Sequence, residues 1–180
     1  MSAALHTASL IVVTHEHMDH IGGLLAQPDL DKLLAVTRLN KEQFDNPERM
    51  TPVVFPAALR AGYKPLEYER YAAIGPGMVL IKAPGHTPGS QLVYVKRADG
   101  AEMLFLGDVA WHNRNIEVQR ERARLVTYFM LKEDRDAVML ELAEFKRLHE
   151  AEPQLEMMPG HDAGVLARFI RAGLLVKGFK

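Results

Sequence analysis

His15-Glu16-His17-Met18-Asp19-His20 is the most informative stretch of this chain. It places three imidazoles and the carboxylates of Glu16 and Asp19 in six consecutive residues, and the spaced pattern uses the three imidazoles and Asp19. From the composition of the chain, the spacing H-x-H-x-D-H should arise by chance in roughly one such sequence per thousand. On an extended segment side chains alternate between two faces, so His15 and His17 point the same way and can bind one ion. Where the chain then turns, Asp19 and His20 can bind a second ion.

The residue types of this stretch restrict the metal without choosing it. Neutral imidazole and carboxylate suit zinc, iron or manganese. The chain contains no cysteine, which excludes disulfides, thiolate nucleophiles and cysteine-type zinc sites. Any metal must therefore be held by histidine and carboxylate.

The composition is that of an ordinary globular protein, with 180 residues of which 48% are hydrophobic and 25% charged. We expect a single domain over residues 1–180. A net charge of -1 gives no reason to expect nucleic acid or an anionic membrane as partner. A small-molecule substrate fits better, and assembly into a homo-oligomer is left open. The apolar run Leu10–Val13 is too short to span a bilayer and follows no basic segment, so we expect a cytoplasmic protein.

Hydrophobic patterning predicts short strands alternating with helices, which is an α/β fold. Strands are expected at 9–13, 33–37, 78–83, 91–96, 102–106 and 154–158. Helices are expected from Ile21 to just before Pro28, from about 133 to 150 and from about 163 to 175. Prolines interrupt residues 40–71, which predicts short helices and loops.

Several local features refine this picture. Asp99-Gly100 marks a hairpin turn between two strands. The helix at 133–150 carries an apolar stripe, and Glu141, Glu144, Lys146 and Arg147 lie off that stripe. Asp162 is expected to cap the last helix. The charged stretch 114–124 is interpreted as a solvated face or loop.

Three further motifs follow in order, each at the end of a predicted strand. They are Pro84-Gly85-His86-Thr87-Pro88-Gly89, Leu106-Gly107-Asp108 and Pro159-Gly160-His161. Together with the His15–His20 stretch, this series resembles the metallo-β-lactamase-fold superfamily, in particular its lactonase and glyoxalase-II-like branch. The resemblance implies an αβ/βα sandwich.

The resemblance also implies a ligand for every position of a two-metal site. It assigns His15, His17 and His86 to one metal, Asp19, His20 and His161 to the other, and Asp108 to a bridge between them. The implied cofactors are two divalent ions, zinc first, with iron or manganese as alternatives. Two ions ~3.5–4 Å apart would hold a bridging hydroxide as the nucleophile. Asp19 would also be catalytic, orienting the hydroxide and passing a proton to the leaving group.

Hydrolysis of a small lactone or ester is the leading functional hypothesis, because the spacing and order resemble the lactonase-type branch most. Lactonases of this type often carry a tyrosine three residues after the bridging aspartate, where this chain has Trp111. Glyoxalase-II-like thioester hydrolysis would require a C-terminal helical region. β-Lactamase branches generally use a cysteine or lack the bridging aspartate. A mononuclear-iron sulfur dioxygenase remains an alternative from another class, whereas a non-catalytic module would be expected to have lost ligands.

Two residues near Asp108 are candidates for substrate binding. Trp111 could line the pocket, although core packing explains it equally well. His112 lies four residues after Asp108 but, like His6 and His149, lacks the company of other candidate ligands.

The chain departs from the family pattern at its start. Family members usually carry several strands before the H-x-H-x-D-H strand, and here about a dozen residues precede it. We therefore expect a sandwich that is N-terminally incomplete, poorly stable and weakly active in isolation. A cooperative, high-temperature melt of a metal-bound monomer would contradict this expectation.

Overall fold

The computed structural model describes residues 2–177 and contains a two-stranded and a five-stranded sheet with helices around them. The elements in chain order are α1 (Ser2–Thr7), β1 (Ile11–Val12), α2 (Met18–Leu25), α3 (Leu30–Ala35), β2 (Thr37–Arg38), α4 (Lys41–Asp45), the 3₁₀-helix η1 (Pro47–Met50), α5 (Ala57–Gly62), β3 (Tyr71–Gly75), β4 (Met78–Lys82), β5 (Gln91–Lys96), β6 (Glu102–Gly107), α6 (Asn113–Glu117), the π-helix η2 (Val126–Leu131), α7 (Arg135–Ala151), β7 (Glu156–Pro159) and α8 (Ala163–Arg171). None of the described helices is long and apolar enough to cross a membrane.

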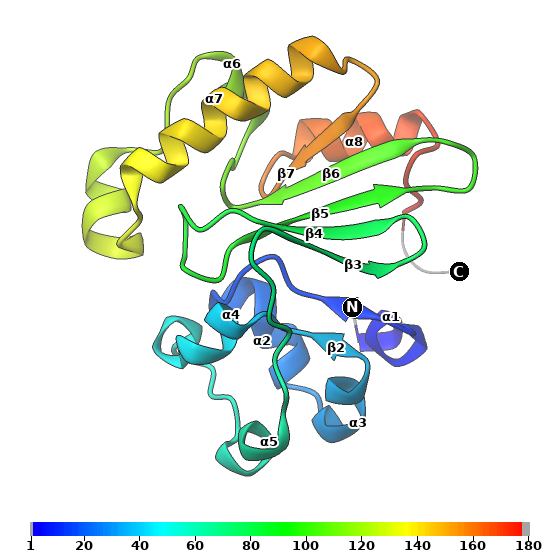
Figure 1. The fold of residues 1–180 in the computed structure, drawn as a ribbon, viewed down its shortest axis with the longest axis vertical. Coiled ribbons are helices and arrows are strands. Elements are labelled where there is room, and N and C mark those ends of the chain that lie inside the picture. Colours follow the sequence, from blue (N-terminus) through cyan, green and yellow to red (C-terminus); the bar gives the residue numbers. More distant parts are fainter. Residues whose placement is uncertain (1, 178–180) are drawn as a thin grey trace.

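The larger sheet has the strand order β3-β4-β5-β6-β7 (Figure 1). Strands β3 to β6 pair antiparallel as a meander, whereas β7 pairs parallel to β6. A parallel pair needs a long crossover, and α7 supplies it. The predicted hairpin between β5 and β6 is confirmed, with Lys96 opposite Glu102. The parallel arrangement places the carboxyl ends of β6 and β7 at the same edge of the sheet.

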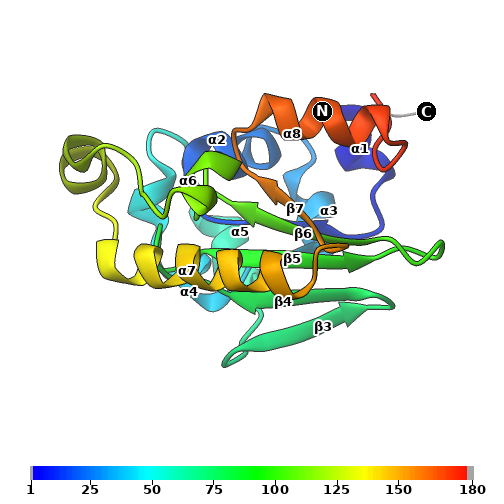
Figure 2. The ribbon, with the colours of Figure 1, turned by 90° about the horizontal axis from the view of Figure 1, so that it is seen from above.

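Helices cover both faces of this sheet, as Figure 2 shows for α7 and α8. Successive residues of β6 point to opposite faces. Leu104 and Leu106 pack in one core cluster with Val138 and Leu142 of α7. On the other face, Met103 packs with residues of α8. The alternation of side chains along β6 therefore provides one apolar face for α7 and another for α8.

The N-terminal elements lie below the sheet in Figure 1, on the side away from α7. Strands β1 and β2 pair parallel, and α2 and α3 pack around them in a second core cluster. A buried amide joins this part to the larger sheet. Gln43 Nε2 donates to Val13 O at 2.9 Å and to Gly89 O at 3.0 Å. These bonds fix the end of β1 against the loop that follows β4.

Two predicted elements of the N-terminal part differ from the structure. The strand expected at 33–37 is wrong, because Leu30, Leu33 and Leu34 have helical spacing and are all buried on one side of α3. The strand that follows is only Thr37–Arg38. The first long helix begins at Met18 rather than Ile21, so it includes the second half of the His-rich stretch.

Some elements and environments in the rest of the chain also differ from expectation. Strand β3 and the π-helix η2 were not predicted. Within the stretch expected to be solvated, Arg122 is only 7% exposed. Glu141, expected off the buried stripe, has a buried Oε2 that makes no hydrogen bond within the described residues. By contrast, Asp162 caps α8 as predicted, accepting from Val165 N at 3.0 Å.

Candidate metal centre

The seven predicted ligands come from the ends of four strands. His15 follows β1, and His17 is the N-cap of α2 with an extended backbone (φ -65°, ψ 150°). Asp19 and His20 lie in the first turn of that helix. His86 lies in the loop after β4, Asp108 follows β6 and His161 follows β7. The predicted change from extended segment to turn is therefore the junction of β1 and α2, and it sends the two halves of the stretch in different directions.

The first group consists of His15, His17 and His86. Their ring centroids lie 4.9 Å apart for His15 and His17, 4.6 Å for His15 and His86, and 4.7 Å for His17 and His86. His86 Nε2 lies 3.0 Å from His17 Nδ1. His15 and His86 are buried, and His17 is partly buried. The three imidazoles thus converge, although His17 and His86 are 69 positions apart in sequence.

The second group consists of Asp19, His20, Asp108 and His161. Asp108 is its centre, since its Oδ1 lies 3.2 Å from His20 Nε2 and its Oδ2 lies 3.1 Å from His161 Nε2. Asp19 Oδ2 lies 3.6 Å from His20 Nε2. Asp108 also reaches toward the first group, with Oδ2 3.8 Å from His86 Nε2. The Asp108 carboxylate therefore lies between the two groups.

Two glycines allow the strand ends to approach this closely. Gly107 has φ +53°, a conformation that other residues rarely adopt, and it turns the chain after β6. A Cβ added to Gly160 would lie 2.3 Å from Asp108 Oδ1 and 2.8 Å from Gly107 O. Only a residue without a side chain fits between Asp108 and the end of β7.

Burial and mutual repulsion keep the imidazoles of the first group neutral near pH 7. Burial and the neighbouring imidazoles lower the pKa of His15 well below its ordinary value. Burial and the nearby His86 lower the pKa of His17 to about 4. Although burial alone would raise the pKa of Asp108, its contact with His20 and the nearby imidazoles of His15 and His86 outweigh burial and hold the pKa below its ordinary value. Neutral imidazoles around an anionic carboxylate are the protonation states that metal ligation requires.

The donor set fits a pair of divalent metal ions. Within each group the candidate ligand atoms lie within 4.8 Å of one another. Among the described residues, the buried atoms His15 Nε2 and Asp108 Oδ1 make no contact with hydrogen-bond geometry, although His20 Nε2 lies 3.2 Å from Asp108 Oδ1. Buried polar atoms are nearly always paired, so these two atoms point to a missing partner at the place where the groups meet. Histidine and carboxylate without cysteine match the ligands expected for zinc, iron or manganese.

Sequence reasoning missed four residues that surround the candidate ligands. Thr14 Oγ1 lies between His15 Nδ1 at 3.2 Å and His20 Nδ1 at 3.3 Å. The buried Glu16 accepts from Thr87 Oγ1 at 2.7 Å and from Gly89 N at 3.1 Å, which ties the His-rich stretch to the His86 loop. Arg122 and Glu133 lie behind His86 and contact its Nδ1. Only adjacency to a ligand could have indicated Thr14 and Glu16, and no local pattern marks Arg122 or Glu133.

The two predicted substrate contacts differ in their surroundings. Trp111 is partly buried, and its Nε1 donates to Asp108 Oδ2 at 2.7 Å. His112 is exposed and its Nδ1 lies 3.3 Å from Asp162 Oδ2. Both lie near the candidate centre, but the indole N–H is already used by the carboxylate.

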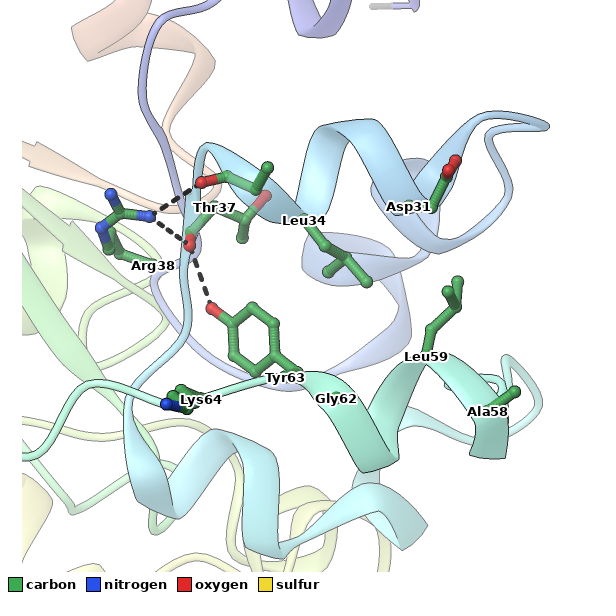
Figure 3. A pocket seen from close by; sticks show the side chains of 10 residues that line it. Asp31, Leu34, Thr37, Arg38, Ala58, Leu59, Gly62, Tyr63 and Lys64 are labelled. Carbon is green, nitrogen blue, oxygen red and sulfur yellow. Dashed lines mark hydrogen bonds between the residues drawn. The ribbon is translucent and has the colours of Figure 1, made fainter.

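A cavity of about 640 Å³ opens beside the first group and includes His17 and Asp19 in its wall. Met18, Arg49 and Met130 also line it. A second pocket, between α3 and α5, contains none of the predicted ligands (Figure 3). In that pocket the Tyr63 hydroxyl donates to Thr37 O at 3.0 Å. The cavity at His17 is therefore placed to receive a substrate.

Comparisons with known proteins agree with this arrangement. The family model described as the metallo-beta-lactamase superfamily matches residues 9–175. Comparison with curated proteins gives no match.

Solved structures share the fold at low sequence identity. A variant of AiiA from B. thuringiensis, with N-decanoyl-L-homoserine bound at its active site, is 18% identical with a TM-score of 0.63, over 91% of this chain and 60% of that chain. TTHA1623 in a di-iron-bound form is 24% identical with a TM-score of 0.56, over 93% of this chain and 80% of that chain. AidC, a dizinc quorum-quenching lactonase, is 18% identical with a TM-score of 0.51, over 82% of this chain and 56% of that chain.

The chain thus spans about 60% of the length of the AiiA structure that it matches. The likeness to these structures confirms the expected α/β fold. Because the family model covers nearly the whole chain, and its four motifs meet at one edge of the sheet, the protein belongs to the metallo-beta-lactamase superfamily.

Proposed function

We propose that this protein is a metal-dependent hydrolase that opens a small lactone or a related ester. The observation that carries the proposal is the convergence of seven histidine and aspartate side chains from four strand ends into two adjoining groups. His15, His17 and His86 would hold one divalent ion, and Asp19, His20 and His161 the other. Asp108 would contact both, because its carboxylate lies between the groups.

Divalent ions bound here would supply Lewis acidity toward a carbonyl and a lowered pKa for water. The side chains of this protein have separate tasks. The neutral imidazoles bind without adding charge, and Asp108 contributes a fixed negative charge. Asp19 is the most accessible of these groups, with its side chain 54% exposed, and it faces the cavity. We assign to its carboxylate two steps, accepting a proton from the attacking water and passing that proton to the leaving oxygen.

The cavity supports a small, partly apolar substrate. The thioether side chains of Met18 and Met130 line it, and the cation of Arg49 lies at the same cavity. An ester with an apolar chain matches this lining. AiiA is described with N-decanoyl-L-homoserine at its active site, and AidC is described as a lactonase, which supports a lactone as the first substrate to test.

The identity of the metal is a separate proposal, with zinc first. AidC is described as dizinc and TTHA1623 as di-iron, so both metals belong in the test. Mononuclear iron with oxygen uptake would instead favour the sulfur dioxygenase alternative.

The decisive experiment combines metal analysis with a substrate panel. Protein stripped with a chelator is reloaded with zinc, iron or manganese and assayed on acyl lactones, thioesters, a β-lactam and a phosphodiester. We expect two metal equivalents and hydrolysis of lactones or esters, lost in Asp108→Asn and retained in the control Asp99→Asn at the exposed hairpin turn. Two bound ions with turnover of another substrate in place of lactones and esters would refute the substrate class, and absence of metal uptake would refute the centre itself.

A further inference from the structure

Arg122 and Glu133 form a buried ion pair directly behind His86. Their side chains are only 4% and 0% exposed. Within the described residues, Glu133 Oε2 and Arg122 Nε have no hydrogen-bond partner. A buried pair that is incompletely hydrogen-bonded is a poor source of stability, because the cost of removing both charges from water is not fully offset. Its presence therefore calls for another role.

Glu133 orients the ring of His86. Its Oε1 contacts His86 Nδ1, and an ionised carboxylate only accepts hydrogen bonds, so this contact requires the proton on Nδ1. The guanidinium of Arg122, which can only donate, is then paired with Glu133 and not with Nδ1. His86 Nε2 is then left with its lone pair, and this atom faces His17 Nδ1 at 3.0 Å. A carboxylate behind a histidine ligand orients the ring and fixes its tautomer for metal binding.

Arg122 connects this arrangement to Asp108. Its guanidinium contacts Glu133 and lies 3.0 Å from His86 Nδ1 through Nη2. The same guanidinium lies 4.8 Å above the ring of Trp111. Trp111 in turn donates from Nε1 to Asp108 Oδ2 at 2.7 Å. His86 and Asp108, one from each ligand group, are thus held from behind by three residues in mutual contact.

We propose that Glu133, Arg122 and Trp111 form one support that positions His86 and Asp108, so that the two ligand groups bind metal as a unit. This inference rests on the metal centre of the proposed function. None of the three residues is a candidate metal ligand. Trp111, which the sequence offered as a substrate contact, acts in this proposal through its hydrogen bond to Asp108, so all three are positioning residues. The proposal also gives Trp111 a role, holding Asp108 through its indole N–H, at the position where lactonases of this type often carry a tyrosine.

The first test separates positioning from stability. The ion pair is replaced by apolar side chains in Arg122→Met/Glu133→Leu, and the control Arg147→Met/Glu144→Leu removes an exposed pair of the same residue types on α7. Cobalt binding to the full chain is measured by competition with a chelator, together with the visible spectrum of the bound ion. We expect the metal-free variant to unfold at no lower urea concentration than the unmodified chain, while its cobalt affinity falls about 10–100-fold. The control should bind cobalt as the unmodified chain does.

The second test approaches the support from its other end and leaves the buried charges intact. Trp111→Phe keeps the ring under Arg122 but removes the N–H that holds Asp108. We expect weaker cobalt binding and a changed spectrum in this variant. The triple variant should lose less affinity than the product of the two separate losses, because both changes act on one support.

The outcomes are distinguishable. Cobalt affinity within twofold of the unmodified chain in both variants would overturn the positioning role. Losses that multiply in the triple variant would show two independent supports and overturn the link through Arg122. If the unmodified chain takes up no metal, the proposed centre fails, and this support fails with it.

Discussion

Replacing Glu141 with glutamine should stabilise the protein at neutral and alkaline pH. Glu141 lies on α7, where its Oε2 is buried against the loop that contains Gly85. Burial, with added repulsion from Asp134 and Glu133, raises the pKa of this carboxyl from 4.5 to about 7. The folded protein therefore binds the proton more tightly than the unfolded chain does. The stability that this group contributes is fully present below about pH 4.5 and is lost as the pH rises through about 7.

The size of the effect follows from the two pKa values of Glu141. The difference between about 7 and 4.5, at about 1.4 kcal/mol for each pH unit, corresponds to roughly 3 kcal/mol once the group is ionised in both states. At pH 5 the folded protein still holds the proton, so the loss is below about 1 kcal/mol. Glutamine stays neutral throughout, so we expect Glu141→Gln to gain about 2–3 kcal/mol over the unmodified protein at pH 8.5 and little at pH 5.

Urea unfolding at pH 5, 7 and 8.5 measures this difference, with a chelator present so that metal binding does not contribute. Glu144→Gln is the matched control, because Glu144 lies on the same helix and is exposed to solvent. Its removal should not change the pH dependence in this range. If Glu141→Gln and the unmodified protein lose stability equally between pH 5 and 8.5, the argument from burial is refuted.

Three further changes test the core, the join between the two parts of the fold and the strand ends. Phe169→Ala removes a fully buried side chain between α8 and the sheet, and the free energy of unfolding in urea should fall by about 3–5 kcal/mol. Gln43→Ala removes one of two side-chain donors from each of the carbonyls Val13 O and Gly89 O, and the loss of these two buried hydrogen bonds should cost about 1–3 kcal/mol in the same measurement. Gly160→Ala would push a methyl group against Asp108, so we expect reduced metal content by elemental analysis while Gly164→Ala, on an exposed turn of α8, keeps it.

The central features of the fold could be predicted because they depend on short-range patterns. Strand β6 contains an apolar run that follows the Asp99-Gly100 turn, and the apolar stripe of α7 has helical spacing, so both were identified close to their actual bounds. The strand expected at 33–37 was wrong because a short apolar run does not distinguish a strand from a buried helix. In the structure, Leu30, Leu33 and Leu34 are buried together on one side of a helix, so the segment is helical.

The positions of the seven candidate ligands could be predicted, whereas the residues behind them could not. His15 to His20, His86, Asp108 and His161 each stand in a motif at a strand end, and the structure brings them together. Their function as metal ligands stays a prediction. Arg122 belongs to a charged stretch that reads as solvated, and its burial depends on Glu133 and Trp111, which meet it only after the chain has folded. Such long-range pairing leaves no local signal.

The position of Asp108 between two distant partners has a consequence for folding. His20 comes from the first helix after β1, and His161 follows the last strand, so the contacts of this carboxylate close two long segments of chain. Contacts of this kind form late, because the entropy of ordering the intervening chain must be overcome first. An isolated half of the protein would contain some of the candidate ligands but could not bring His20 and His161 together at Asp108. Occupancy of the centre would therefore report that both ends of the polypeptide have reached their native places.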